Sequence, residues 1–335
     1  MYSRCKGIAI RAIAAAAPKK ILDNEQFAET VNDKRFRRRI LYTGIKKRHA
    51  VVGRQRTSDL ASLAGEAILN KLQWDRASIG TLIFITQNPD LGAPSTAMLI
   101  QSKLGLSEDL LAFDVNLGCS GFTSGVQIMA GILRQTKGRG LLLMGDCQHY
   151  APGTEYAADS ILFGDGGAAV AMEYDENAED IPAFSMTDGS RFKALCSTFD
   201  RGHIMDGNAI VLFSLNEVVD SINAFHEYYG IQREDVDYYA LHQAQKIIVD
   251  GVAHNCALPE NKVLKCYEQY GNTSSASIPF ALCANTALYD KERLAIFGCG
   301  FGIGLAWSGV LIHVSKEGIL PLIESDYAYP DLFSD

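Results

Sequence analysis

The chain has 335 residues, of which 47% are hydrophobic and 21% charged, and its formal net charge is -8. This composition can fill a large core, and the acidic balance argues against general nucleic-acid binding, which needs a basic surface. The sequence shows no signal-peptide pattern, no apolar run near the roughly 18 residues of a membrane span and no CxxC pair among its eight cysteines, so we expect a reduced, cytoplasmic protein.

The first half of the chain alternates runs that are typical of strands and helices. The apolar run at residues 8–17 suits a buried strand. After Cys119, apolar side chains recur at steps of four, three and four residues, which indicates one buried face of a helix. The further strands expected in this half lie at residues 81–86, 111–115, 140–144 and 168–172.

The second half repeats this order after about residue 173. Strands that alternate with helices imply right-handed crossovers and a mostly parallel sheet that is covered on both faces. The sequence therefore predicts a duplicated α/β fold with halves at residues 1–172 and 173–335. In the second half we expect strands at residues 238–241, 263–266, 294–297 and 305–314, and helices at residues 215–229, from 243 and from 274.

A local cluster of eight lysines and arginines lies between Lys34 and Arg48 of the otherwise acidic chain. The cluster suits a solvated helix and loop. It equally suits a landing site for an anionic carrier, either an acidic protein or a phosphate-bearing cofactor. Both interpretations stay open.

One cysteine has a setting that favours catalysis. Cys119 directly follows Gly118, between a predicted strand and the start of a predicted helix. A helix N-terminus carries a partial positive charge and free N–H groups, which lower the pKa of a thiol, and the N–H of Cys119 can itself donate to an oxyanion. An isolated buried cysteine usually serves only to fill the core, so the hypothesis that Cys119 is catalytic depends on this setting.

His242 and Asn272 complete a candidate site. His242 follows the predicted strand 238–241, and ligand sites form at the carboxyl ends of parallel strands. Asn272 follows a glycine in a segment patterned like the one around Cys119, so a pseudo-twofold axis between the halves would make the two residues face each other. Each residue alone suits a helix terminus or cap. Together the three predict a catalytic site.

A glycine-rich segment at residues 298–304 alternates glycine with other residues. It differs from a dinucleotide-binding fingerprint, because it lies near the C-terminus and runs into another predicted strand. Alternate glycines suit a backbone that approaches a substrate closely and directs N–H groups at it. No group of His, Cys, Asp and Glu has metal-ligand spacing, so we expect no metal site.

These motifs together closely resemble the β-ketoacyl-acyl-carrier-protein synthase III family of the thiolase superfamily. The resemblance implies the thiolase fold, in which duplicated βαβαβαββ halves form five αβαβα layers, and a homodimer whose sheets continue across the interface. It also implies acyl-CoA or acyl-carrier-protein thioesters as substrates and no permanently bound cofactor. The resemblance is carried by residues 42–49, 114–122, 163–166, 242–244, 271–277 and 298–304.

The resemblance further implies a catalytic triad of Cys119, His242 and Asn272. An acyl group would transfer to Cys119 while the N–H groups of Cys119 and Ile303 hold the oxyanion. A malonyl thioester would then lose carbon dioxide as His242 and Asn272 donate to its carbonyl, and the resulting carbanion would attack the acyl group and give a 3-ketoacyl product.

Several positions depart from the family pattern. Arg38 and Tyr42 stand where housekeeping members place a tryptophan and an arginine against the coenzyme A adenine. The segment after His242 lacks the carrier-contacting arginine of the family, so the expected carrier-binding residues are Arg37, Arg38, Lys46 and Lys246. These departures suggest a specialised member that serves a secondary-metabolite or surface-glycan pathway.

Ala93 is expected to affect the acyl pocket. It lies in a segment that resembles the one that crosses the dimer interface to close the partner's pocket, and short-chain members have a bulky aromatic residue at this position. The smaller side chain favours longer or branched acyl groups, unless a neighbour such as Leu91 or Met98 refills the space.

Two other functions fit the same residues. Relatives of the family pass the acyl group to a hydroxyl or an amine, and the triad alone does not distinguish a carbon acceptor from a heteroatom acceptor. A non-catalytic subunit that shapes the cavity of another synthase is the third alternative, although such subunits usually lose the nucleophile.

Overall fold

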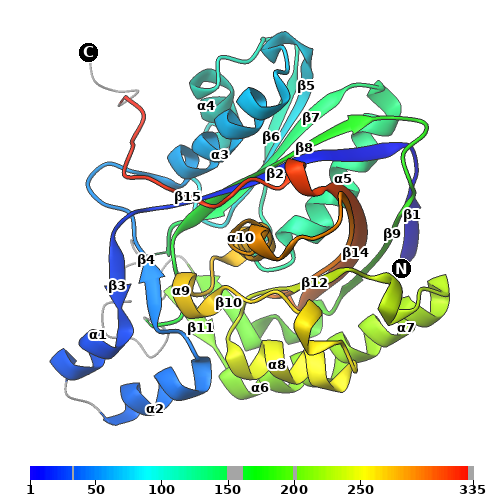
Figure 1. The fold of residues 1–335 in the computed structure, drawn as a ribbon. Helices are drawn as coiled ribbons and strands as arrows, with labels where there is room; N and C mark the ends of the chain where they lie inside the picture. Colours follow the sequence, from blue (N-terminus) through cyan, green and yellow to red (C-terminus); the bar gives the residue numbers. More distant parts are fainter. Residues whose placement is uncertain (32–33, 149–160, 199–201, 331–335) are drawn as a thin grey trace.

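The computed structural model describes residues 1–31, 34–148, 161–198 and 202–330. Two main β-sheets lie face to face in this part of the chain (Figure 1). The six-stranded sheet has the order β15-β2-β8-β7-β5-β6 and consists of β2 (Ile8–Ala17), β5 (Ile79–Ile85), β6 (Leu111–Val115), β7 (Arg139–Asp146), β8 (Gly166–Tyr174) and β15 (Ile323–Glu324). The five-stranded sheet has the order β1-β9-β14-β13-β12 and consists of β1 (Tyr2–Cys5), β9 (Ile181–Thr187), β12 (Tyr238–Leu241), β13 (Arg293–Gly302) and β14 (Ala306–Ser315).

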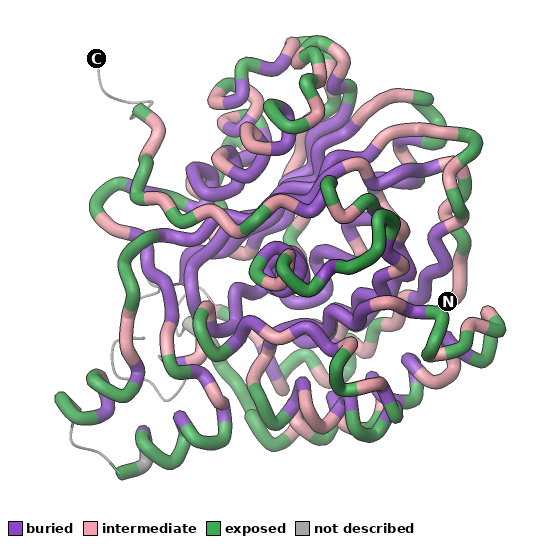
Figure 2. The backbone as a smooth tube through the Cα atoms, viewed as in Figure 1, coloured by how far each residue is buried: buried purple, intermediate pink, exposed green. Residues whose placement is uncertain are grey.

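Helices complete five layers around the two sheets. α5 (Gly121–Thr136) and α10 (Ser277–Ala284) pack between the sheets, because each contacts strands of both. Buried residues run through both sheets and these central helices (Figure 2). The outer face of the six-stranded sheet is covered by α3 (Thr57–Leu72) and α4 (Thr96–Lys103), and that of the five-stranded sheet by α6 (Gly207–Phe213), α7 (Val219–Tyr229) and α8 (Lys246–Asn255).

The strand order confirms the predicted duplication, but the expectation of a mostly parallel sheet is wrong for the five-stranded sheet, where β12 and β13 form the only parallel pair among the described strands. In the first sheet β2 and β8 are antiparallel, β8 and β7 are antiparallel, and β7 and β5 are parallel. The series β9, β14, β13 and β12 repeats these three relations in the second sheet. The predicted helix after Cys119 is α5, and its apolar face is buried at Phe122, Val126, Met129 and Leu133.

The prediction of a strand at residues 263–266 is wrong. Only Val263 forms a parallel bridge, to Tyr239, at the place that β6 occupies in the first sheet. The side chain of Gln243 supplies the bonds that a neighbouring strand would make, since its Oε1 accepts from the N–H of Cys266 at 2.8 Å and its Nε2 donates to the carbonyl of Leu264 at 3.2 Å. The same bonds keep Gln243 out of the helix expected there, and α8 begins three residues later, at Lys246.

The terminal strands cross between the halves. β1 pairs with β9 of the five-stranded sheet, and β15 pairs with β2 of the six-stranded sheet. The division after residue 172 falls inside β8 and stays a prediction.

None of the helices in the described ranges has the length and apolar character that are needed to span a membrane. The remaining elements are β3 (Ile21–Asp23), α1 (Asn24–Val31), α2 (Lys34–Thr43), β4 (Lys47–His49), β10 (Leu195–Thr198), β11 (Gly202–Met205) and α9 (Tyr267–Tyr270), with short 3-10 turns between them and a π-helical turn before α7.

Candidate active site

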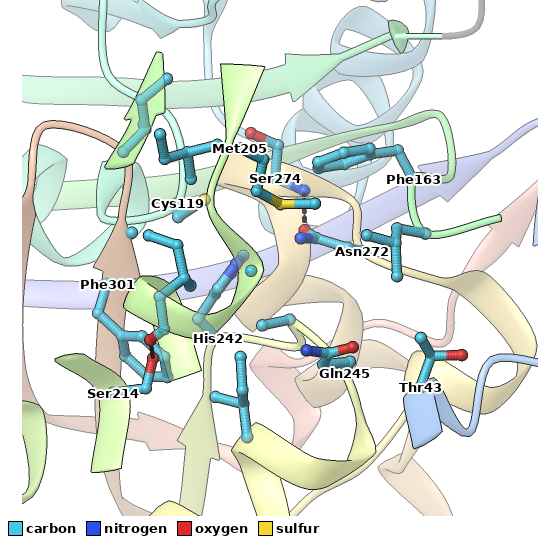
Figure 3. Close-up of a pocket in the computed structure, with 18 of the residues that line it drawn as sticks. Thr43, Cys119, Phe163, Met205, Ser214, His242, Gln245, Asn272, Ser274 and Phe301 are labelled. Carbon is cyan, nitrogen blue, oxygen red and sulfur yellow. Dashed lines mark hydrogen bonds between the residues drawn. The ribbon is translucent and has the colours of Figure 1, made fainter. Parts of the chain in front are cut away.

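A cavity of about 300 Å³ brings the predicted catalytic residues together. Cys119, His242 and Asn272 line it from three separate segments (Figure 3). Ile303, from the glycine-rich segment, lines it as well. The exposed residues of its lining, which include Tyr42, mark the mouth of the cavity. The apolar part of its wall is formed by Leu162, Phe163, Leu195, Met205, Ile210, Ile248 and Phe301.

Cys119 lies in the turn between β6 and α5 and is 9% exposed. Burial raises the pKa of its thiol to about 11, because a thiolate there loses its hydration, while hydrogen bonds from the backbone N–H groups of Ile303 and Cys119 act in the opposite direction. The sequence-based expectation of a lowered pKa is therefore wrong, since burial outweighs the effect of the helix terminus. The resting thiol is neutral.

The glycine-rich segment packs its backbone against Cys119. A Cβ atom on Gly302 would lie 2.8 Å from the Sγ of Cys119, and one on Gly300 would lie 2.7 Å from its carbonyl oxygen. The close approach expected of these glycines is therefore to the cysteine itself. It places the N–H of Ile303 at the sulfur, where an oxyanion on an acylated Cys119 would form.

Gly302→Ala is expected to slow acylation of Cys119 by about 100-fold, since a displacement near 1 Å at a reacting atom has an effect of that size. Time-resolved intact-mass measurement of the acyl adduct provides the rate. Gly298→Ala is the matched control on the same strand, because the nearest atom to its added Cβ is 3.4 Å away, on Phe122. Equal rates in the two variants would show that the glycines do not position the nucleophile.

His242 is fixed at the carboxyl end of β12. Its backbone N–H donates to Cys299 at 2.8 Å, and its ring Nδ1 lies 2.6 Å from the Oγ of Ser277. Because Ser277 Oγ also accepts from the N–H of Gln243, we assign its hydroxyl hydrogen to Nδ1, which leaves the imidazole proton on Nε2. Burial lowers the pKa of His242 to about 3. The ring is therefore a neutral donor.

Asn272 is held between α9 and the segment that precedes β8. Its backbone N–H donates to Leu162 at 2.8 Å, and its carbonyl accepts from Gly164 at 3.1 Å. The side-chain Oδ1 accepts from the N–H of Ser274 at 2.9 Å (Figure 3). This bond orients the amide and leaves its nitrogen as the donor that Asn272 presents to the cavity.

Sequence reasoning missed a buried carboxylate that supports the site. Asp146 ends β7 and accepts hydrogen bonds from the N–H of Gln87 at 2.7 Å, the Oγ1 of Thr86 at 3.1 Å and the Oγ of Ser275 at 3.1 Å. It thereby ties the ends of β5 and β7 to the Asn272 segment. Burial raises the pKa of Asp146. The signal that could have found it is the rule that selected His242, a polar residue at the carboxyl end of a parallel strand.

The expected carrier-binding residues lie near the mouth of the cavity. Arg37 and Arg38 are exposed on α2, and Lys46 forms an ion pair with Glu268 at 2.6 Å. Lys246 starts α8 beside the end of α2, since a Cβ atom on Gly44 would lie 2.7 Å from its Cβ.

Two features of the basic segment differ from a uniform surface patch. Arg48 is buried and donates to the Oδ1 of Asn24 at 2.8 Å and to the carbonyl of Phe163 at 3.2 Å, so it belongs to the interior. Desolvation lowers its pKa to about 10. The guanidinium of Arg38 lies over the ring of Tyr42, 5.5 Å from its centroid.

Ala93 lies outside the cavity of its own chain. It is exposed in the loop between β5 and α4, so a role in an acyl pocket requires a second copy of the chain.

Within the described ranges, no three His, Cys, Asp or Glu residues are grouped so that they could hold a metal ion.

Comparisons with known proteins agree with the fold. Two family models match, 3-oxoacyl-[acyl-carrier-protein] synthase III at residues 113–189 and its C-terminal part at residues 227–314. The β-ketoacyl-[acyl-carrier-protein] synthase III of Streptococcus equi subsp. zooepidemicus is 31% identical over 322 residues, which cover 91% of this chain and 98% of that protein. That of Acholeplasma laidlawii is 32% identical over 304 residues, covering 89% and 96%.

A solved structure extends the likeness to the whole fold. The 3-oxoacyl-(acyl-carrier protein) synthase from Burkholderia xenovorans LB400 superimposes with a TM-score of 0.91 at 28% identity, covering 97% of this chain and 99% of the other. The five layers and the duplicated strand order described above are those of the thiolase fold. The chain therefore belongs to the β-ketoacyl-acyl-carrier-protein synthase III family.

Proposed function

We propose that the protein joins an acyl thioester to a malonyl thioester by decarboxylative Claisen condensation through an acyl-Cys119 intermediate. The observation that carries this proposal is the convergence of a thiol, a neutral imidazole and an oriented amide in one cavity. A nucleophile for the acyl group and two donors for a developing enolate are what the two half-reactions require.

The first half-reaction exchanges one thioester for another. Cys119 Sγ attacks the acyl carbonyl, the carbon–sulfur bond to the donor breaks, and the donor thiol leaves with the proton that Cys119 loses. The oxyanion accepts from the N–H groups of Cys119 and Ile303, which already meet the sulfur in the resting site.

The second half-reaction forms the carbon–carbon bond. The thioester carbonyl of the malonyl group accepts from His242 Nε2 and the amide nitrogen of Asn272, each worth roughly 3 kcal/mol when charge develops on that oxygen. Carbon dioxide leaves, the enolate carbon attacks acyl-Cys119, and the 3-ketoacyl thioester departs. The released thiolate takes up a proton, because burial raises the pKa of this thiol.

Incubation with an acyl-CoA panel and carboxyl-labelled malonyl thioester tests the proposal. We expect an acyl adduct on Cys119 by intact mass, release of labelled carbon dioxide and a 3-ketoacyl product. An adduct that forms without carbon dioxide release, and that instead passes to a hydroxyl or amine, would identify the heteroatom acyltransferase as the correct function.

We also propose that the exposed cations beside the mouth receive an acyl carrier protein. Reversal of Arg37, Arg38 and Lys46 to glutamate is expected to raise the KM for a carrier-bound donor by roughly tenfold at low salt and to flatten its salt dependence. Steady-state kinetics at several ionic strengths provide the readout.

The matched control for this reversal carries the same charge change far from the mouth. Lys71, Arg134 and Lys137 are exposed at the ends of α3 and α5. If both triple variants raise the KM equally, net charge is responsible and the carrier docks elsewhere.

The guanidinium of Arg38 lies over the ring of Tyr42, at the positions where the family resemblance expects the residues that hold the coenzyme A adenine. We therefore propose a specialised member that uses carrier-bound donors. Acyl carrier protein should then outperform coenzyme A as the donor.

A homodimer is proposed from the free edge of the six-stranded sheet. Within the described residues β6 pairs on one side only, with β5, so its other edge presents unpaired backbone groups that a second copy can continue. Ala93 lies in the loop beside this edge, before α4, and would reach the partner's pocket. Sedimentation tests the dimer, and comparison of acetyl and octanoyl donors in Ala93→Phe tests the pocket.

A further inference from the structure

Two glutamine side chains line the cavity from adjacent strands. β5 and β7 are parallel neighbours, with Ile85 opposite Met144, so their carboxyl ends meet at one edge of the sheet. Gln87 follows β5 and Gln148 follows β7, and both line the cavity. Asp146 fixes this arrangement by accepting from the N–H of Gln87 at 2.7 Å.

Gln148 is a buried part of the cavity wall, and Gln87 is partly buried. Gln148 is 6% exposed, whereas Tyr42 and Met205 at the mouth are 51% and 37% exposed. Gln87 lies against the residue before the nucleophile, because a Cβ atom on Gly118 would be 3.0 Å from its Cδ. Because Gln87 lies beside Cys119 and both glutamines line the same cavity, we expect an acyl group carried on Cys119 to extend along these two carboxamides.

The Oε1 of Gln148 is buried and has no hydrogen-bond partner among the described residues. A buried acceptor without a donor is unfavourable, and a pure hydrocarbon chain placed beside it would remove water without supplying a donor. A pocket for an unsubstituted chain needs no carboxamide at this place.

With the carboxamide of Gln148 assigned so that Oε1 is its buried atom, we infer that the acyl group accepted by Cys119 carries a hydrogen-bond donor, a hydroxyl or an amide N–H, that pairs with this oxygen. Gln87 supplies a second carboxamide on the same wall. This inference rests on the proposed function, since it names the class of acyl donor for that site. The specificity follows the rule that a site built to bond a polar substituent rejects the analogue that lacks it.

Three donors of matched length test the inference: hexanoyl-CoA, 3-hydroxyhexanoyl-CoA and N-acetyl-β-alanyl-CoA. Wild-type protein is expected to be acylated by the hydroxyl or the amide donor with a kcat/KM about tenfold or more above that of hexanoyl-CoA. The faster of these two substrates shows whether the site accepts a hydroxyl or an amide N–H. Gln148→Met, which keeps the size and removes the acceptor, should abolish this preference or favour hexanoyl-CoA.

The wild-type comparison decides the inference even if a variant fails to fold. Equal or faster acylation by hexanoyl-CoA would overturn it and show that solvent satisfies Gln148. A wild-type preference that Gln148→Met leaves intact would also overturn the assignment to this residue. Failure of all three acyl groups to form an adduct on Cys119, when they are offered on acyl carrier protein as well as on coenzyme A, would count against the proposed function itself, whereas adducts formed without discrimination count against this inference alone.

Discussion

Cys119→Ala is expected to form no acyl adduct and to lose condensation by at least roughly four orders of magnitude, because Cys119 is the only thiol among the described residues that line the cavity. Intact mass after incubation with acyl-CoA measures the adduct, and labelled carbon dioxide measures condensation. Cys299→Ala is the matched control. Cys299 is fully buried and lies on the strand that touches Cys119, but it does not line the cavity.

The acyl adduct should be lost only when Cys119 is replaced, and replacement of any other cysteine should leave it in place. Each of the eight cysteines is free. Burial raises the pKa of Cys266, Cys283 and Cys299, as it does that of Cys119, so the distinction is one of position: none of these three lines the cavity. An adduct that persists in Cys119→Ala at the wild-type rate would show that the acyl group is carried elsewhere.

Asn272→Asp is expected to keep acylation of Cys119 and to slow decarboxylation of the malonyl thioester by about 100- to 1000-fold. The substitution retains the oxygen that accepts from Ser274 but replaces the amide donor with a second acceptor, which repels the enolate. Single-turnover release of labelled carbon dioxide from pre-acylated enzyme isolates this step. Asn272→Ala should behave similarly, with a further loss of stability because the N–H of Ser274 is left unpaired.

The adjacent Thr273→Ala is the control, since this buried side chain does not line the cavity. The deficit of Asn272→Ala, which adds no titrating group, should be constant between about pH 5 and pH 8, because His242 has a pKa of about 3 and stays neutral throughout this interval. If Asn272→Asp decarboxylates at the wild-type rate, Asn272 serves only to cap the turn at Ser274.

The fold could be predicted largely from residue patterns. The strands at residues 111–115 and 238–241 match β6 and β12, because apolar runs between polar turns have few alternatives. The segment at residues 263–266 could not be predicted, since the partner of its backbone is the side chain of Gln243, about twenty residues away along the chain. Periodicity reports which face is buried and contains no information on such bonds.

The candidate site shows a similar division. Cys119, His242 and Asn272 were identifiable because each directly follows a strand or a glycine turn, and the structure places all three in one cavity. The thiol pKa was predicted in the wrong direction, because helix position is visible in a sequence whereas the extent of burial is not. Ser277, which sets the tautomer of His242, was also missed, since its role depends on a contact across 35 positions.

The crossing of the terminal strands has a consequence for synthesis of the protein on the ribosome. β1 emerges first, yet its partner β9 begins about 175 residues later, and β2 lacks its outer neighbour until β15 has been made. Neither sheet can therefore be completed from one half of the nascent chain. Since contacts between residues so distant in sequence slow folding, we expect the N-terminal segment to be the last part of the five-stranded sheet to dock and to remain accessible to chaperones until then.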